Sequence, residues 1–294
     1  MATEAINLSG ETKGKAAQVA EGFWIIATGH HPGGSLGFPE INNRCLVMRL
    51  QEAGTPVLVV FNGTEPSAIP EVKRIEQEQG VAVKYIVSPG GGHHVLMPPW
   101  HDAFENATIL LPPARIPRTA GGKKLMGLPR VKLLDPDAPL SQFAGQIDVV
   151  LFRGVNAMHD HPSPGEGGPD GFLTMMGMMY KMMFKMTDPI DELWVHHIAT
   201  GTVIGGENLG WMFPAEVRAK APFMVKSMLK PDPVFIFTTP RKVADRAMVS
   251  ACWNKILSWP AKTVMTYHDT PGFAFQGDGQ AALRSAVQAA GQLS

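Results

Sequence analysis

The chain has 294 residues, of which 45% are hydrophobic and 18% charged, and its 26 Lys and Arg balance 26 Asp and Glu. This neutral composition, without a run of basic residues, argues against nucleic-acid binding and against a polybasic membrane anchor. Two cysteines, Cys45 and Cys252, are too few for a disulfide framework, and no apolar run reaches membrane-spanning length. We therefore expect a soluble, cytoplasmic protein that binds neither nucleic acid nor membrane.

Short apolar runs alternate with amphipathic segments along the chain, which favours one α/β domain. Residues 1–21 are polar and are expected to form a loose N-terminal arm before a single domain over 22–294. The expected strands are 23–28, 45–50, 57–61, 81–87, 108–111, 147–152, 193–198, 202–204 and 263–267. The expected helices are 67–79, 100–104, 241–259 and 279–290, with Gly80 ending the first and Asp278 capping the last.

The ten histidines are unevenly placed. Adjacent residues of a strand point to opposite faces, so His196 and His197 are expected to be ordinary strand residues with local hydrogen-bond partners. A pair in a loop after a strand can converge on one ion, and His93 and His94 have that setting. His268 follows the last expected strand. The sequence therefore offers three imidazoles at strand ends as candidate metal ligands.

Four segments follow one another in an order that a known family shares. They are VLVVFN at 57–62, VKYIVSPGGGHH at 83–94, VIGGEN at 203–208 and TYHDTPGFAFQG at 266–277. Their order and spacing resemble the metallo-β-lactamase-like superfamily, and the likeness extends over about residues 22–290. The resemblance implies an α/β fold, a four-layer αββα sandwich, and a metal-dependent hydrolase.

The chain departs from the superfamily's pattern at the first of its two metal sites. Pro89 and Gly91 stand where two histidines are expected, and neither side chain can bind a metal. The resemblance carries the second metal site to His93, His94, Glu207 and His268. His93 would replace an aspartate there, and Glu207 would replace a shorter bridging aspartate. The resemblance therefore implies one metal per chain.

Three imidazoles and one carboxylate suit a divalent metal, with Zn²⁺ as the first choice and Fe²⁺ or Mn²⁺ as alternatives. Such a metal brings a bound water to a pKa near 7 and so supplies a nucleophile. The expected catalytic residues are Glu207, which leaves a position open for water if it does not bind the metal, and His159, which lies close to the place of a missing family histidine. The alternative is that these histidines only form hydrogen bonds in loops and that the metal site is lost.

A methionine-rich insertion is expected at about 162–190. Seven of the 17 methionines lie in 175–186, and four of them fall at helical spacing on one face: Met175, Met179, Met182 and Met186. Flexible, polarisable methionines suit a core or oligomer-contact helix, and they equally suit a lid over an apolar or aromatic substrate.

Two functions from different classes fit these residues. The first is a hydrolase that uses one metal-activated water on a small apolar or aromatic substrate, such as an ester, a lactone or an activated aryl ether, for example a nitroaryl methyl ether. The second is a non-catalytic structural subunit of a hetero-oligomer, because loss of the first metal site is expected of such a partner. A homo- or hetero-oligomer is expected in either case.

Overall fold

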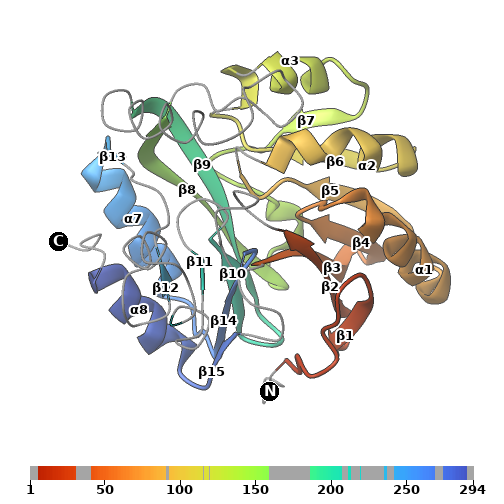
Figure 1. The fold of residues 1–294 in the computed structure, drawn as a ribbon, viewed down its shortest axis with the longest axis horizontal. Coiled ribbons are helices and arrows are strands. Elements are labelled where there is room, and N and C mark those ends of the chain that lie inside the picture. Colours follow the sequence, from red (N-terminus) through yellow and green to blue (C-terminus); the bar gives the residue numbers. More distant parts are fainter. Residues whose placement is uncertain are drawn as a thin grey trace.

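The computed structural model describes residues 6–30, 41–90, 93–114, 116–118, 120–158, 186–206, 211–212, 219, 235–236, 242–268 and 274–289. In these residues two β-sheets face each other, and helices cover both outer faces (Figure 1). This arrangement confirms the predicted α/β fold with four layers in the order αββα.

The first sheet comes from the N-terminal half of the chain. Its described strands lie in the order β1 (Ala16–Ala20), β2 (Phe23–His30), β3 (Ile41–Glu52), β4 (Thr55–Phe61), β5 (Val83–Val87), β6 (Thr108–Leu111) and β7 (Val131–Leu133). The first four are antiparallel neighbours, and β4 to β7 run parallel. Its outer face carries α1 (Ile69–Gln79), α2 (Met97–Ala103) and α3 (Ala120–Met126).

The second sheet comes from the C-terminal half. Its described strands lie in the order β13 (Lys242–Val243), β8 (Ile147–Met158), β9 (Met186–His197), β10 (Thr202–Gly205), β14 (Thr263–Thr266) and β15 (Phe275–Gln276). Its outer face carries α7 (Arg246–Ile256) and α8 (Gly279–Ala289). A separate two-stranded sheet pairs β11 (Trp211–Met212) with β12 (Phe235–Ile236). Among the described residues, the short 3₁₀ helices are η2 (Pro66–Ala68), η3 (His93–Leu96), η4 (Ile116–Arg118) and η5 (Ser141–Phe143).

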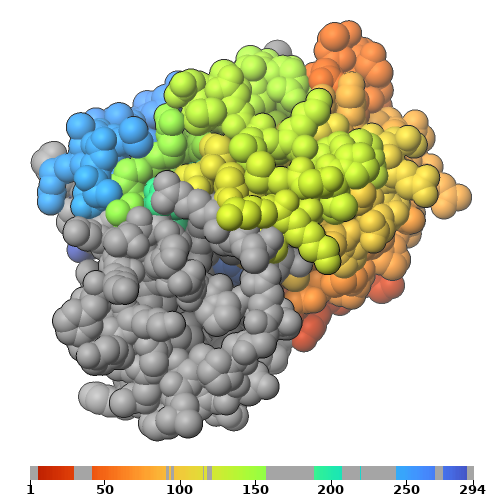
Figure 2. Space-filling view, turned by 90° about the horizontal axis from the view of Figure 1, so that it is seen from above, coloured from red at the N-terminus to blue at the C-terminus, as the bar shows by residue number. Residues whose placement is uncertain are grey.

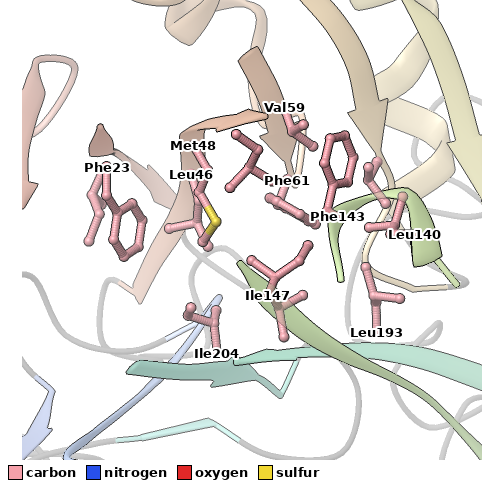
Figure 3. Packing of buried hydrophobic residues seen from close by; sticks show 14 of the residues in the cluster. Phe23, Leu46, Met48, Val59, Phe61, Leu140, Phe143, Ile147, Leu193 and Ile204 are labelled. Carbon is pink, nitrogen blue, oxygen red and sulfur yellow. The ribbon is translucent and has the colours of Figure 1, made fainter. Parts of the chain in front are cut away.

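Three buried clusters match the three interfaces between the four layers. Between the sheets, Leu46 and Phe61 of the first sheet face Ile147 and Ile204 of the second (Figure 3). The alternation of side chains along β3 explains this division, because Leu46 points to the central cluster while its neighbour Cys45 points to the cluster under α1 and α2. The apolar runs of the sequence are therefore strands that are buried on both faces.

The predicted helix ends are confirmed at two positions. Gly80 follows α1 in the left-handed conformation with φ of 61°, which glycine adopts without strain. Asp278 accepts a hydrogen bond from the backbone of Ala281, at 2.9 Å, and so caps α8. Cys45 and Cys252 are both free thiols, as predicted, and burial raises the pKa of each.

The predicted loose arm over 1–21 is wrong for the described residues from 6 onward. Ile6 and Leu8 are buried in the central cluster, and residues 16–20 form β1, which pairs with β2. The polar composition hid a strand whose alternate residues, Ala17 and Val19, face the core. This alternation covers only two core-facing residues, which is too short to distinguish an edge strand from a polar arm in the sequence.

One helix begins later than predicted, and a further helix and a further strand were not predicted. The helix expected over 241–259 begins at Arg246, because Lys242 and Val243 pair with β8 and the Asp245 side chain caps the helix by accepting from Met248 N at 2.9 Å. The proline-rich middle of the chain also contains α3 and β7, which the sequence pattern did not predict. Of the methionine-rich insertion expected at about 162–190, residues 162–185 lie outside the described residues. Residues 186–190 belong to β9, so Met186 lies in a strand and the helical spacing predicted for it is wrong. Among the described residues no helix is long and apolar enough to cross a membrane.

Candidate metal centre

Strand ends from both sheets meet at one rim of the sandwich. The parallel strands β4 and β5 end at Phe61 and Val87, and β14 of the second sheet ends at Thr266. The backbone N–H of Arg44, in β3, donates to the carbonyl of Tyr267 at 3.0 Å, so the two sheets touch here. Polar residues that follow these strands are therefore brought together although they are far apart in sequence.

His93 and His268 meet at this rim. His93 begins η3 after the loop that follows β5, and His268 lies two residues beyond β14. Their Nε2 atoms are 2.9 Å apart, with ring centroids 4.9 Å apart and ring planes at 61°. The two residues are 7% and 5% exposed, so both imidazoles are withdrawn from bulk water.

The other ring nitrogen of each histidine faces an oxygen that can only accept. His268 Nδ1 lies 3.2 Å from the backbone carbonyl of Asn42, and His93 Nδ1 contacts the side-chain oxygen of Asn62. Each Nδ1 must therefore carry the proton and donate it, which leaves the lone pair of a neutral ring on Nε2. Two lone pairs cannot face each other at 2.9 Å without a cation between them, either a proton or a metal ion.

The orientation of Asn62 is fixed by its own partners. Its amide nitrogen donates to the Arg44 carbonyl at 2.8 Å and to Asn43 Oδ1 at 3.0 Å, so its oxygen is the atom that faces His93. Asn62 has φ of 60°, a left-handed conformation that asparagine tolerates better than most residues. Because the backbone turns directly after β4, the Asn62 amide can contact the His93 ring.

The loop after β5 is tied to the second sheet where the superfamily pattern expects two histidines. The buried carbonyl of Pro89 accepts from Leu193 N at 2.6 Å, and Gly90 forms an isolated β-bridge with Glu192. The side chain of Glu192, 1% exposed, accepts from Gly206 N at 2.9 Å. Glu192 therefore fixes the backbone directly before Glu207.

Adjacent glycines at the end of β10 have separate structural reasons. A Cβ on Gly205 would lie 2.2 Å from the ring of Trp194, and Gly206 has φ of 75°. Both positions exclude an ordinary side chain, the first for lack of space and the second for its backbone conformation.

The structure thus brings together two of the four predicted metal ligands, His93 and His268. His94 lies in η3, but the position of its side chain is outside the described part of the structure. Glu207 and His159, the two predicted catalytic residues, also lie outside the described residues. Among the residues that are described, no group of three or more His, Cys, Asp or Glu side chains is placed to hold a metal ion.

The prediction for the strand histidines is confirmed. His196 Nδ1 contacts Asp148 Oδ2 at 3.1 Å, and His197 Nδ1 contacts Thr200 Oγ1 at 2.9 Å. Burial lowers the pKa of His196, although Asp148 partly opposes this effect. Burial, followed by the nearby His196, lowers the pKa of His197 to about 4.

Three polar residues of this rim were not found from the sequence: Glu11, Asn42 and Arg44. All three are buried and are joined to one another. The available signal was the polar run 42–44 directly before the apolar run 45–48, because polar residues buried in a strand need partners.

A surface groove of about 560 Å³ lies elsewhere on the molecule. It runs between α7 and the segment before η5, which adjoin in Figure 2, and its lining includes Pro136, Arg153, Met248 and Cys252. None of the rim residues lines this groove, so the groove and the histidine pair are separate features.

No protein-family model matches the sequence, and no curated protein matches it either. Solved structures do resemble the fold. A metallo-β-lactamase from Erythrobacter litoralis superposes with a TM-score of 0.52 at 15% identity, over 99% of this chain and 96% of that one. A metallo-β-lactamase from Hirschia baltica gives 0.53 at 11% identity, over 93% and 96%. The metal-soaked Flv1 flavodiiron core from Synechocystis gives 0.53 at 11%, over 97% and 61%. The chain therefore has a metallo-β-lactamase-like fold, as the sequence predicted.

Proposed function

We propose that this chain is a metal-dependent hydrolase that holds one divalent metal on His93 and His268, with His94 and Glu207 as further ligands. The observation that supports it is the pair of Nε2 atoms 2.9 Å apart, each on a ring whose Nδ1 proton is already donated to a carbonyl oxygen. In a tetrahedral site, two imidazole nitrogens that each lie about 2.0–2.1 Å from a zinc ion are about 3.3 Å apart. The described pair, at 2.9 Å, would need to open by only about 0.4 Å to hold the ion.

The surrounding residues prepare both imidazoles for a metal. Histidine ligands of metals commonly donate their second ring proton to a carbonyl or carboxylate, which fixes the tautomer and orients the ring. The backbone carbonyl of Asn42 does this for His268, and the Asn62 amide does it for His93. Burial keeps water from competing for the two nitrogens.

A divalent metal, with Zn²⁺ as the first choice and Fe²⁺ or Mn²⁺ as alternatives, supplies a Lewis acid and lowers the pKa of water to about 7. We assign His159 a contact with the substrate or with the metal, and Glu207 a second role as a catalytic residue. The proposed substrate is a small apolar or aromatic ester, lactone or activated aryl ether. The methionine-rich segment 175–186 supports an apolar substrate, because methionine packs well against aromatic rings. Two of the structural neighbours are named as metallo-β-lactamases, which supports hydrolysis as the reaction class.

The metal content of the purified chain tests the proposal. After reconstitution with excess Zn²⁺ and removal of free metal, the wild type should retain about one equivalent. His93→Ala and His268→Ala should each lose most of it. His197→Asn is the matched control, because His197, at 6% exposed, is as buried as His93 and has Thr200 as its hydrogen-bond partner instead of a rim residue.

A reconstituted chain should then hydrolyse at least one member of a panel of aryl esters, lactones and nitroaryl methyl ethers. Retention of less than about a tenth of an equivalent of any transition metal by the wild type would contradict the proposal. That result would favour the alternative function, a non-catalytic subunit of a hetero-oligomer.

A further inference from the structure

A buried ion pair contacts the strand end that precedes His268. The side chains of Glu11 and Arg44 are both fully buried, with Nε 2.6 Å from Oε1 and Nη2 2.7 Å from Oε2. These two parallel bonds form the bidentate arrangement that guanidinium and carboxylate groups prefer. A buried ion pair contributes little net stability, because the cost of removing both charges from water offsets their attraction. Stability alone therefore does not explain why this pair lies beside the candidate metal centre.

Arg44 holds the strand end that carries His268. Its backbone N–H donates to the carbonyl of Tyr267 at 3.0 Å, and its Nη1 donates to the carbonyl of Thr266 at 3.4 Å. The hydroxyl of Thr266 in turn donates to the carbonyl of His268 at 3.0 Å. The backbone on which the His268 ring is mounted is thus fixed from the first sheet, through one arginine.

Glu11 reaches the ring of His268 by a second route. The side-chain nitrogen of Asn42 donates to Glu11 Oε1 at 3.3 Å, and the backbone carbonyl of Asn42 accepts from His268 Nδ1 at 3.2 Å. The carboxylate therefore orients the residue that orients the imidazole. Both routes start from one side chain in the N-terminal segment and end at one proposed ligand.

The charge of Glu11 also matters. Arg44 places a guanidinium beside the backbone of residues 266 and 267, where an unpaired positive charge would repel a divalent cation bound at His268. Glu11 cancels that charge at contact distance. Loss of the carboxylate would therefore weaken metal binding both by loosening the ring and by exposing the metal to the charge of Arg44.

We propose that Glu11 is a positioning residue of the metal centre: through Arg44 and Asn42 it fixes the ring of His268, and it neutralises the guanidinium that lies next to it. This inference rests on the proposed function. It gives the N-terminal segment, which packs against the rest of the first sheet, a direct part in the centre.

The test uses the full chain and measures metal binding instead of activity. Glu11→Gln removes the charge and nearly preserves the shape, and Glu11→Leu combined with Arg44→Met removes both charges and leaves no unpaired one. Glu71→Gln is the matched control. Glu71 also ties the N-terminal region to the chain, by accepting from Ala16 N at 3.0 Å and pairing with Arg74, but it lies on α1.

Two readouts are taken at a temperature where circular dichroism shows each variant to be folded. Zn²⁺ affinity is measured by competition with a chromogenic chelator, and the geometry of the ligands is followed by the visible absorption of bound Co²⁺. We expect Glu11→Gln and the double variant to bind Zn²⁺ about 10- to 100-fold more weakly and to give an altered Co²⁺ spectrum. The control should match the wild type in both readouts, even if it unfolds at a lower temperature.

The outcomes separate this inference from the proposed function. If the wild type binds Zn²⁺ and folded Glu11 variants bind it within twofold of the wild type, with an unchanged Co²⁺ spectrum, the positioning role is wrong while the metal centre stands. If the wild type itself binds neither ion, the proposed function fails and the inference fails with it. Glu11→Asp, which keeps the charge but draws it back by one methylene, carries the same test should the other variants not fold.

Discussion

Lowering the pH should destabilise the fold strongly through His197, a buried histidine that is not one of the proposed metal ligands. The residue is 6% exposed at the end of β9, where its ring packs on Phe23 with centroids 5.2 Å apart. Burial is the main reason that its pKa falls from 6.5 to about 4. In the folded protein the ring is therefore neutral at pH values where the unfolded chain already binds a proton.

The sign and size follow from this difference. Because the unfolded state takes up a proton below pH 6.5 and the folded state does not until about pH 4, stability falls as the pH is lowered through this interval. The loss is complete below the folded pKa. Each unit of pKa difference corresponds to about 1.4 kcal/mol, so the shift amounts to about 3 kcal/mol. That is a large share of the 5–15 kcal/mol that is typical of folded domains.

Urea unfolding at pH 7.0, 5.5 and 4.5 measures the effect, with His197→Asn as the comparison. Asparagine can still reach Thr200 but does not titrate, so the variant should lose less stability than the wild type between pH 7.0 and 4.5. Carboxylates also contribute to acid unfolding, but they are the same in both proteins and cancel in the difference. Equal loss of stability in the two proteins would refute the argument.

Three further predictions concern single positions. Gly205→Ala should lower the free energy of unfolding, measured by urea, by about 1–3 kcal/mol, because the added Cβ would lie 2.2 Å from the Trp194 ring. An unchanged urea midpoint would contradict this packing. Asp278→Ala should lower the free energy of unfolding by about 1 kcal/mol, because α8 loses its N-terminal cap. Thermal unfolding measures this loss by comparison with Asp278→Asn, which retains a capping oxygen. Asn62→Leu should reduce Zn²⁺ affinity about 10- to 100-fold in a chelator competition, because the His93 ring loses its contact with Asn62. Wild-type affinity in the folded variant would show that this contact does not orient the ring.

The fold was largely predictable because residues within or next to most elements indicate where each one begins and ends. The hairpin of β3 and β4 has two apolar runs separated by the turn at Ala53 and Gly54, and both helix-end signals, Gly80 and Asp278, lie where the structure needs them. One element that the sequence did not predict, β1, is stabilised by residues outside its own segment, some of them distant in the chain. β1 depends on pairing with β2, and no local pattern of its five residues distinguishes it from a polar arm.

The candidate site was predictable to a smaller extent, for the same reason. His93 and His268 could be chosen because imidazoles after strands are chemically distinctive and the order of segments resembled a known fold. The residues that orient them could not, because Glu11 and Arg44 become partners only when the N-terminal segment folds back beside β2, where Lys13 pairs with Ala27. An asparagine such as Asn62 is equally common as a plain turn residue, so its contact with His93 has no signature in the sequence.

The central claim is that one metal ion lies between His93 and His268. Anomalous diffraction from a crystal of the full chain grown with Zn²⁺, collected on both sides of the zinc absorption edge, tests it most directly. We expect a single zinc peak per chain at the rim, about 2.0–2.2 Å from the Nε2 atoms of both histidines. A zinc peak at any other place, or a map without one in which the two Nε2 atoms remain in hydrogen-bond contact, would contradict it.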